Sequence, residues 1–561
     1  MNRTLFAFCT LLVSIGVNAQ TFEWAKSFGS SLADYGLSIA LDASGNVYTT
    51  GYFQGTADFD PGAGTANRTS SGGRDIWVQK LYASGNFIWA RSFGGSLDDI
   101  GRSITVDASG NVYTTGYFQG TADFDPGAGT ANITSAGNED IFIQKLDASG
   151  NFLWAKSFGG SLADYGLSIA VDAAGNVYTT GYFQGTADFD PGAGTANHSS
   201  IGNEDIFVQK LDTSGDFVWA RSFGDSNSDR GNSICVDASS NVYTTGGFDG
   251  TVDFDPGAGT TNLTSEGSLD VYVQKLNATG NFVWARSFGG SLNDQGFSIT
   301  VDDSGNVPTT GSFEGTVDFD PGAGSATRTS TGSLDVFVQK LSASGTYDWA
   351  ISFGASSSDQ GYSVTVDASG NVYTTGSFLG TADFDPGSGT ANLTSAGPWD
   401  IFIQKLNASG NFVWAKSFGD SSIDGGYSIT TDASGNIFTT GHFAGTVDFN
   451  PGVGTANLTS AGNYDIFIQK LSQGVNGIVD IVKGININTF PNPSSGLVQL
   501  SFEEALNNVE IVLTNMQGKV VYTMNLNAAT NELINIDGSA GIYFLCVKAP
   551  QGQTVVKLVK E

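Results

Sequence analysis

The chain has 561 residues, of which 76 are glycine and 12% are aromatic, and its formal net charge at pH 7 is −31. Disordered glycine-rich chains lack this aromatic content, so the composition indicates a folded protein in which glycine marks turns between strands. The acidity argues against nucleic acids and anionic membranes as partners, because these are bound by basic patches. Calcium, cationic partners and plain solubility remain open as explanations of the charge.

Residues 1–19 have the pattern of a secretory signal peptide. Arg3 supplies a positive charge, residues 5–17 form a short apolar segment, and Ala19 ends a small-residue cleavage site. The apolar segment is shorter than the ~20 residues that a membrane-spanning helix needs. We therefore expect export through the Sec pathway and a mature chain without a membrane span.

Residues 20–472 repeat with a period of 65 residues. A tryptophan marks the copies: Trp24, Trp89, Trp154, Trp219, Trp284, Trp349 and Trp414. In a consensus copy the predicted strands are 166–172, 177–183, 205–211 and 217–224, which aromatic and β-branched residues fill. Turns of the Ala-Ser-Gly-Asn type close the hairpins, because glycine and asparagine tolerate a positive φ. A long polar loop with Asp-Pro-Gly-Ala-Gly joins the second strand to the third, and the regular period predicts a repeat architecture.

The strands are apolar on both faces, as in Ile206, Phe207 and Val208, so both sides of each sheet must be covered. Four-stranded blades around an axis provide that cover in a β-propeller; a solenoid, the alternative, usually has shorter repeats and needs caps. The repeats begin on a fourth strand at 22–28 and end on a third strand at 465–471. We predict an all-β fold: a seven-bladed β-propeller whose N-terminal strand closes the last blade, followed by a small β-sandwich. The Gly-x-Ser-Ile strand is expected to be innermost and the Trp-Ala-Lys-Ser-Phe strand outermost.

Three motifs of the repeat resemble a known family. Asp-x-x-Gly-Asn-Val-Tyr-x-Thr-Gly, Asp-x-Phe-Val-x-Lys-Leu and Trp-Ala-Lys-Ser-Phe-Gly-Gly are similar to the motifs of SBBP-type β-propeller repeats in secreted bacterial proteins. The resemblance covers about four-fifths of the chain. It implies the fold and leaves the activity open, because that family is defined by its repeat.

The end of the chain differs in character from the repeats. Residues 473–485 are expected to form a linker, and residues 486–561 a small β-sandwich with strands such as 509–513 and 541–547. This domain resembles the C-terminal sorting domain of the type IX (Por) secretion system of Bacteroidetes. The residues that carry the resemblance are Pro491, Asn492, Pro493, Gly518, Lys519, Gly541 and Tyr543. The resemblance implies export across the outer membrane by the type IX machinery, often with removal of the tail and attachment to surface lipopolysaccharide.

Aspartate is the charged residue that recurs most often in the repeats. One copy lies at the exit of each fourth strand, one precedes the first turn, one opens the third strand, and the long loop adds a pair. The loop pairs are calcium candidates, because hard cations bind carboxylate oxygens: Asp58, Asp60, Asp123, Asp125, Asp188 and Asp190. We favour turn chemistry instead, in which the carboxylates accept backbone N–H groups, since no loop matches a known calcium motif. No other cofactor is expected.

Catalytic residues are not visible in the pattern. A glycosidase needs two carboxyl groups in different environments, whereas the carboxylates of these copies are nearly alike. His198 and His442 occupy different repeat positions and lack the neighbours of a zinc site or a Ser-His-Asp triad. We therefore predict no catalytic residue and no enzyme activity.

Several residues depart from the repeat, and these are where individual function is expected. They are Arg230, Asn232, Pro308, Trp399, His442 and Asn450. Pro308 lacks a backbone N–H, so it predicts an edge strand or a locally broken pair. Whether the departures converge in space does not follow from the sequence.

The leading hypothesis is a secreted or cell-surface module that binds a glycan or a protein without catalysis. A carbohydrate-active hydrolase or lyase with a site in the central channel is the first alternative, and a calcium-stabilised structural surface protein is the second. An enzyme predicts that unlike polar residues from several blades meet in one deep pocket. A binding module predicts a shallow aromatic or polar face around the ring.

Overall fold

The computed structural model describes residues 20–452, 454–473, 487–515, 519–550 and 552–560. Every regular element in these residues is a β-strand, which confirms the all-β fold class. Thr21–Gln473 forms one compact unit, and the strands from Ile487 onward belong to a second. The signal peptide expected at 1–19 and nearly all of the linker expected at 473–485 lie outside the described residues. A search of the described part of the chain for a helix able to cross a membrane finds none.

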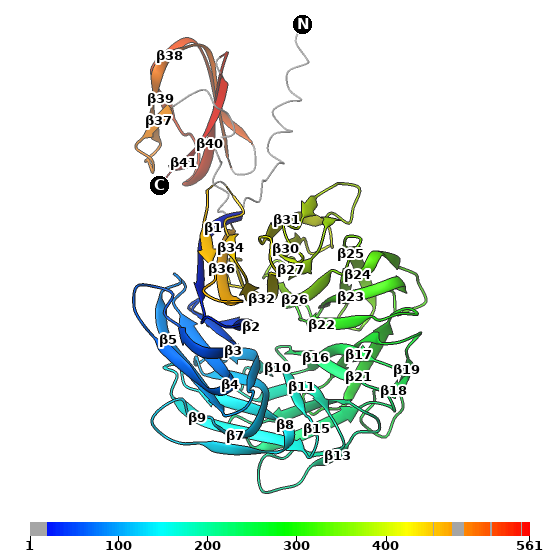
Figure 1. The fold of residues 1–561 in the computed structure, drawn as a ribbon. Coiled ribbons are helices and arrows are strands. Elements are labelled where there is room, and N and C mark those ends of the chain that lie inside the picture. The colour runs from blue at the N-terminus through cyan, green and yellow to red at the C-terminus, as the bar shows by residue number, and fades with distance from the viewer. Residues whose placement is uncertain (1–19, 453, 474–486, 516–518, 551, 561) are drawn as a thin grey trace. The chain divides into compact units, whose positions relative to one another are not determined.

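The repeats form seven four-stranded units arranged in a ring (Figure 1). The inner strands, in order of units 1 to 7, are β2 (Tyr35–Leu41), β6 (Ile100–Val106), β10 (Tyr165–Val171), β16 (Arg230–Val236), β22 (Gln295–Ile299), β26 (Gln360–Val366) and β32 (Gly425–Thr431). The second strands are β3 (Val47–Asp58), β7 (Val112–Asp123), β11 (Val177–Phe183), β17 (Val242–Phe248), β23 (Val307–Asp318), β27 (Val372–Phe378) and β33 (Ile437–Phe443).

The third and outer strands complete each unit. The third strands are β4 (Asn67–Leu81), β8 (Asn132–Leu146), β14 (Asp205–Leu211), β20 (Asp270–Leu276), β24 (Thr327–Leu341), β30 (Asp400–Leu406) and β36 (Asp465–Gln473). The outer strands are β5 (Phe87–Gly95), β9 (Phe152–Gly160), β15 (Phe217–Phe223), β21 (Phe282–Phe288), β25 (Tyr347–Phe353), β31 (Phe412–Phe418) and, for unit 7, β1 (Gln20–Phe28). The Gly-x-Ser-Ile strands therefore lie innermost and the Trp-Ala-Lys-Ser-Phe strands outermost, as expected.

A circle of hydrogen bonds joins the inner strands. In each unit the serine Oγ of the inner strand accepts the N–H of a residue in the next inner strand: Ser38 from Ile104, Ser103 from Ile169, Ser168 from Ile234, Ser233 from Ile299, Ser298 from Val364, Ser363 from Ile429 and Ser428 from Ile39. The last bond spans 389 positions of sequence and measures 3.2 Å. The repeats are thus a closed ring, and not an open solenoid.

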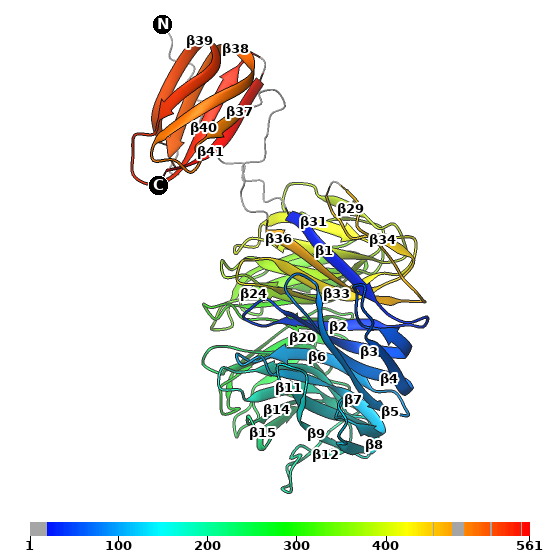
Figure 2. The same ribbon diagram turned by 90° about the vertical axis from the view of Figure 1, so that its left-hand side faces the viewer.

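The N-terminal strand β1 supplies the outer strand of unit 7, where it pairs with β36 (Figure 2). Glu23 forms an ion pair of 2.7 Å with Lys470 on β36. Phe28 packs edge-on against Trp77 of unit 1, with ring centroids 5.3 Å apart. The first strand of the chain therefore completes the last sheet, as the sequence predicted, and covers the edge that β36 would otherwise expose.

The hydrophobic core lies between neighbouring units. In the cluster between units 1 and 2, Tyr48 and Ile76 pack with Phe118 and Phe142 of the following unit. The tryptophans belong to this layer: Trp89 is 7% exposed and donates its Nε1–H to the Ala148 carbonyl of the next unit. Burial on both faces explains why these strands do not alternate between apolar and polar residues.

The connection between second and third strands is more ordered than the polar loop that the sequence predicts. It forms a two-stranded ribbon, continuous with the main strands in units 1, 2 and 5. In the other units the ribbon is a separate pair: β12 (Thr186–Asp188) with β13 (Asn197–Ser199), β18 (Thr251–Asp253) with β19 (Asn262–Thr264), β28 (Thr381–Asp383) with β29 (Asn392–Thr394), and β34 (Thr446–Asp448) with β35 (Asn457–Thr459). Hydroxyl pairs such as Thr56 with Thr69, 2.8 Å apart, stabilise it across the strands.

Pro308 shortens one inner strand. Pro308 lies in β23, opposite Lys340 of β24. The neighbouring inner strand β22 has five residues, whereas β2 has seven. Five of the other units carry a tyrosine here, which donates its hydroxyl to a turn aspartate, as Tyr48 does to Asp42. Of the two outcomes that the sequence predicted for Pro308, the locally broken pair is the one present.

The C-terminal unit contains β37 (Ile487–Phe490), β38 (Leu497–Asn515), β39 (Val520–Asn535), β40 (Gly541–Ala549) and β41 (Gly552–Lys560). These strands form one five-stranded sheet around a single apolar cluster that includes Ile511 and Leu545. A β-sandwich has two sheets that face each other. Here the long strand β38 pairs with β37, β39 and β40 along its length, so all five strands are hydrogen-bonded into one continuous sheet.

Candidate binding site at the centre of the ring

Every inner strand carries a β-bulge at the same position, between a constant glycine and a constant serine. The bulged residue varies: Leu37, Arg102, Leu167, Asn232, Phe297, Tyr362 and Tyr427. A bulge takes one residue out of the ladder and redirects its side chain. The flanking glycine is constant because the preceding unit leaves no room: a Cβ on Gly101 would lie 2.7 Å from Thr50 Oγ1. A constant backbone thus presents a side chain whose type varies around the ring.

Three further variable positions lie at the same ends of the strands. The first residues of the inner strands are Tyr35, Ile100, Tyr165, Arg230, Gln295, Gln360 and Gly425. Paired with them on the second strands are Tyr52, Tyr117, Tyr182, Gly247, Ser312, Ser377 and His442. The residues before the constant aspartate of the third strands are Arg74, Glu139, Glu204, Leu269, Leu334, Trp399 and Tyr464. We call the side chains at these four positions the axial cluster.

Arginine lies over tyrosine in three consecutive units of the axial cluster. The guanidinium carbon is 5.0 Å from the ring centroid for Arg74 over Tyr52 and 5.6 Å for Arg102 over Tyr117. Arg230 lies 4.8 Å from the ring centroid of Tyr182 in unit 3. Such cation–π contacts hold the planar guanidinium groups in place while their edges stay free to donate hydrogen bonds.

In the part of the chain that the structure describes, one of these three arginines is paired with a carboxylate. Arg230 donates from Nε and NH2 to the two oxygens of Glu204, at 2.5 and 3.1 Å. This hydrogen bond to Glu204 raises the pKa of Arg230. Arg74 and Arg102 are exposed, and within the described residues neither has an ion pair.

Aromatic rings continue the cluster through the remaining units. Ring centroids are 5.8 Å apart for Phe297 and Tyr362, 5.1 Å for Tyr362 and Tyr427, and 5.3 Å for Tyr427 and His442. Across the closure of the ring, His442 lies 4.7 Å from Tyr35. Burial raises the pKa of Tyr362 to about 12 and also raises that of Tyr427, so these two phenols remain neutral hydrogen-bond donors.

His442 is a buried part of this arc. Its side chain is 4% exposed, burial lowers its pKa to about 3, and its Nδ1 has no hydrogen-bond partner in the described part of the chain. The ring is therefore neutral at neutral pH and packs as an aromatic side chain between units 7 and 1.

His442→Ser is expected to lower the free energy of unfolding by about 2 kcal/mol, because it leaves a cavity beside Tyr35 and Tyr427. Serine is the residue at the matching position of units 5 and 6 (Ser312 and Ser377), so the backbone tolerates it. The control is His198→Leu, which copies Leu263 of the next unit and is expected to change stability by less than ~0.5 kcal/mol. Equal effects of the two substitutions in urea denaturation would contradict the packing role of His442.

The departures noted in the sequence divide into two groups. Arg230, Asn232 and His442 belong to the axial cluster, and Trp399 joins it with an exposed ring whose Nε1 donates to the Ser358 carbonyl. Pro308 and Asn450 lie elsewhere. Sequence reasoning missed Arg74, Arg102 and the tyrosines. A position-by-position comparison of the seven copies would have found them, because these four positions vary while their neighbours are constant.

The calcium candidates use their carboxylates in turns. Asp58 Oδ1 accepts the N–H groups of Asp60 and Ala66 at 3.0 and 2.8 Å, and Asp60 Oδ1 accepts that of Gly62 at 2.8 Å. The other candidates, Asp123, Asp125, Asp188 and Asp190, repeat these bonds. In the described residues no three His, Cys, Asp or Glu side chains gather as metal ligands. Calcium binding stays a prediction that chelation would test.

Two other aspartates per unit are buried. Asp99 accepts the N–H of Gly95 at 2.6 Å and that of Gln119 at 3.1 Å, and burial raises its pKa to about 7. Asp75, within β4, has its pKa raised to about 6 by burial. A Cβ on Gly94 would lie within 2.9 Å of both carboxyl groups, so only glycine fits between them. These aspartates anchor the strand ends and are structural.

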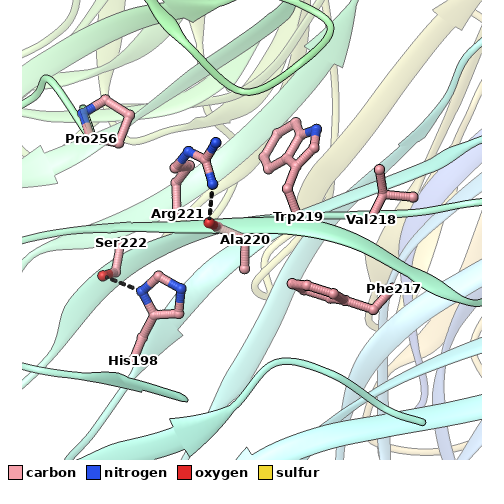
Figure 3. A pocket seen from close by; sticks show the side chains of 8 residues that line it. All are labelled: His198, Phe217, Val218, Trp219, Ala220, Arg221, Ser222 and Pro256. Carbon is pink, nitrogen blue, oxygen red and sulfur yellow. Dashed lines mark hydrogen bonds between the residues drawn. The ribbon is translucent and has the colours of Figure 1, made fainter. Parts of the chain in front are cut away.

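Pockets lie at the outer strands. One of about 510 Å³ is lined by Trp219, Arg221 and Pro256, and in it Ser222 Oγ lies 2.9 Å from His198 Nδ1 (Figure 3). A similar pocket of about 570 Å³, with Arg286 and Pro321, occurs one repeat later. The serine recurs in every repeat, so the His–Ser contact is an ordinary surface pair. The pockets are a feature of the repeat and carry no individual site.

Family profiles match two parts of the chain. Residues 488–561 match a secretion system C-terminal sorting domain, and residues 88–120, 153–185 and 348–377 match a β-propeller repeat. The chain carries SBBP-type β-propeller repeats and a type IX sorting domain. A sorting domain of this kind implies association with the secretion machinery and export to the cell surface or the medium.

Sequence relatives of the propeller are distant. An uncharacterized WD repeat-containing protein of Acanthamoeba polyphaga mimivirus is 25% identical over 434 residues, which cover 64% of this chain and 31% of the relative. Regulatory protein FlaEY of Caulobacter vibrioides is 25% identical over 265 residues, which cover 45% of this chain and 25% of FlaEY. The chain thus spans a third or less of the length of these relatives.

Two solved structures from Porphyromonas gingivalis also match. PorZ, a surface component of the type IX secretion system, aligns with 98% of this chain and 88% of its own, at 11% identity and a TM-score of 0.22. Latent PorU aligns with 70% of this chain and 32% of its own, at 10% identity and a TM-score of 0.12. At these scores neither structure bears on the fold or the function of the propeller.

The described sorting-motif residues hold the end of the sorting domain. Asn492, between Pro491 and Pro493, donates to the Lys557 carbonyl and accepts the N–H of Val559, each at 2.8 Å, so it fastens the last strand. Tyr543 is buried and donates to the Ser539 carbonyl at 2.7 Å. Two others lie at strand ends, Lys519 just before β39 and Gly541 at the start of β40, while Gly518 lies outside the described residues.

Proposed function

We propose that the protein is an exported, non-catalytic binding module and that the axial cluster of its propeller holds a glycan or protein ligand. The observation that carries the proposal is the contrast between positions. The residues that close and pack the ring are nearly the same in all units, whereas the four positions of the axial cluster differ and lie together at one end of the inner strands. Selection for folding alone gives no reason for that contrast.

The composition of the axial cluster supports binding. Tyrosine and arginine are the residues that contribute most to recognition surfaces, because each offers a large contact area together with hydrogen-bond donors. The cluster combines exposed Arg74, Arg102 and Trp399 with the tyrosine rings of units 1 to 3. The cluster has two carboxylates, Glu139 and Glu204, and Glu204 is held by Arg230, which argues against a role for Glu204 as a general acid. A hydrolase or lyase site is therefore less well supported than binding.

The test is a binding screen of the full-length protein against glycans and cell-surface proteins, followed by two matched substitutions. Tyr52→Ser removes an axial tyrosine and copies Ser312, and Tyr82→Ser removes an exposed tyrosine from a turn at the opposite end and copies Ser342. We expect Tyr52→Ser to weaken binding at least ~tenfold, the loss of one contact residue of about 1.4 kcal/mol or more. Tyr82→Ser is expected to bind like the natural protein.

Two results would contradict the proposal. One is a ligand whose affinity falls with Tyr82→Ser and not with Tyr52→Ser. The other is turnover of a bound polysaccharide, which would favour the enzyme alternative. Melting curves of both variants separate a loss of binding from a loss of folding.

A further inference from the structure

We propose that units 1 and 2 of the propeller form a site for an acidic saccharide, in which Arg102 and Arg74 bind the carboxylate of a uronic acid residue and the neighbouring tyrosines bind its ring. The inference rests on the proposed function, since it assigns a ligand class to the axial cluster. It adds which units bind, which atoms recognise the ligand, and what charge the ligand carries.

The axial cluster contains its own template for carboxylate binding. In units 3 and 4, Arg230 lies over Tyr182 and holds both oxygens of Glu204 in a fork of two hydrogen bonds. Planar guanidinium and carboxylate groups match in this geometry. Arg74 over Tyr52 and Arg102 over Tyr117 repeat the arginine-on-tyrosine half of the arrangement. Although the axial cluster also holds Glu139, neither of these two arginines has a carboxylate at ion-pair distance in the described residues, so the fork of each guanidinium group is open to a ligand.

Arg102 occupies the position best suited to meet a ligand. It is the bulged residue of its inner strand, it is exposed, and its neighbours at the same position in units 1 and 3 are leucines. Its charge reaches tyrosines of three other units, because burial raises their pKa values and Arg102 opposes the rise at Tyr52, Tyr165, Tyr182 and Tyr427. Arg74 acts on Tyr52 in the same way. The two arginines lie over tyrosines of neighbouring units, Arg74 over Tyr52 and Arg102 over Tyr117.

The backbone disfavours an acidic peptide as the ligand. An extended peptide usually binds by adding a strand to a free sheet edge. The edges of the inner strands face the axis, but a serine of the preceding unit already takes an N–H from each, such as that of Ile104. The groups left to bind a ligand are therefore side chains: neutral phenol donors, aromatic rings and guanidinium groups. A sugar ring with hydroxyl groups, C–H faces and one carboxylate uses all three.

The repeats supply matched substitutions for the test. Arg102→Leu copies Leu37 and Leu167, and Arg74→Leu copies Leu269 and Leu334, so neither change is foreign to its position. Arg328→Leu is the control. It copies Leu263, removes the same charge, and lies on an outer ribbon where Arg328 donates to the Ala350 carbonyl. Arg328→Leu therefore controls for the change in net charge of one unit.

Binding of the full-length protein is measured by calorimetry with galacturonate, mannuronate and glucuronate oligomers, each paired with its carboxyl-reduced form. We expect at least one acidic oligomer to bind, with a dissociation constant at least ~tenfold below that of its reduced partner. Arg102→Leu is expected to weaken that binding at least ~tenfold and Arg74→Leu in the same direction, while Arg328→Leu binds as the natural protein does.

The inference is overturned if no acidic oligomer binds, if acidic and reduced forms bind equally, or if Arg102→Leu leaves the affinity unchanged. Oligoglutamate that binds more tightly than every saccharide, and depends on Arg102, would make the ligand an acidic peptide and overturn it as well. These failures differ from failure of the proposed function. A neutral glycan or a protein whose binding depends on Tyr52 would keep the axial cluster as the binding site while refuting its specificity for acid.

Discussion

A chain that lacks residues 20–28 is expected to lose about 4 kcal/mol or more of stability and to become sensitive to proteases at its far end. The deletion removes β1, the outer strand of unit 7. It exposes the surface that Phe28 and Trp24 cover between units 7 and 1, and burial of each large apolar side chain contributes roughly 1.5–3 kcal/mol. It also leaves β36, more than 400 residues away in sequence, as an open edge.

Rescue in trans distinguishes ring closure from a general loss of packing. A synthetic peptide of residues 20–30, added to the shortened chain, is expected to restore part of the melting temperature and the protease resistance of β36. Peptide of the same composition in scrambled order is the control. Unchanged melting of the shortened chain, or equal rescue by the scrambled peptide, would show that β1 does not close the ring.

The melting temperature is expected to fall as the pH rises from 5 to 8, the reverse of the usual behaviour of acidic residues in ion pairs. Burial raises the pKa of aspartates at two positions in every unit: Asp34, Asp99, Asp164, Asp229, Asp294, Asp359 and Asp424, and Asp75, Asp140, Asp205, Asp270, Asp335, Asp400 and Asp465. The values that are highest lie at about 7, as for Asp99 and Asp270.

The sign follows from linkage. A carboxyl group whose pKa is higher in the folded state binds a proton more tightly there, so its contribution is complete below the unfolded value near ~4 and is lost as the pH rises through 6 to 7. The aspartates in the turns affect stability in a different pH range. At Asp107, burial raises the pKa, but bonds from Asn111 and Tyr113 outweigh it and lower the pKa, so its contribution is lost only below pH ~4. Burial lowers the pKa values of His442 and His198, so their contributions to stability are lost below pH ~6.5; these are two groups against fourteen.

Calorimetry at pH 5, 6, 7 and 8 and constant ionic strength measures the effect. Asp99→Asn removes one buried carboxyl group and is expected to reduce the difference in melting temperature between pH 5 and pH 8, whatever it does to stability at a single pH. Asp107→Asn is the matched control from a turn and is expected to leave that difference unchanged. A melting temperature that rises from pH 5 to pH 8 would mean that these carboxylates are stabilised as anions.

The fold was predictable because the repeat is nearly exact and its ends are out of phase. The period of the tryptophans predicted the length of the repeating unit. The unpaired fourth strand at 22–28 predicted that the ring closes through the last unit. The ribbon between second and third strands was not predicted, because its residues are polar and its stability comes from cross-strand contacts such as Thr56 with Thr69. Pattern alone reads such a segment as a loop.

The candidate site was predictable only in part. Arg230 and His442 stood out as single departures, but the cluster depends on a β-bulge, which redirects residues such as Arg102 without any mark in the hydrophobic pattern. The pairing of Arg230 with Glu204 joins residues of neighbouring units, 26 positions apart, and no local rule indicates it. The loop aspartates, in contrast, behave as turn chemistry predicts, since Asp58 accepts two backbone N–H groups.

The bulge on each inner strand separates what the ring needs in order to fold from what it presents to a partner. Glycine and serine on either side do the packing and the hydrogen bonding, and the residue between them is free to differ. Exchange of one repeat for another within such a gene would then reshuffle the residues around the axis while every interface between units stayed the same. The units of the ring are thus interchangeable in structure. New binding specificities can arise by rearrangement of existing repeats as well as by point mutation.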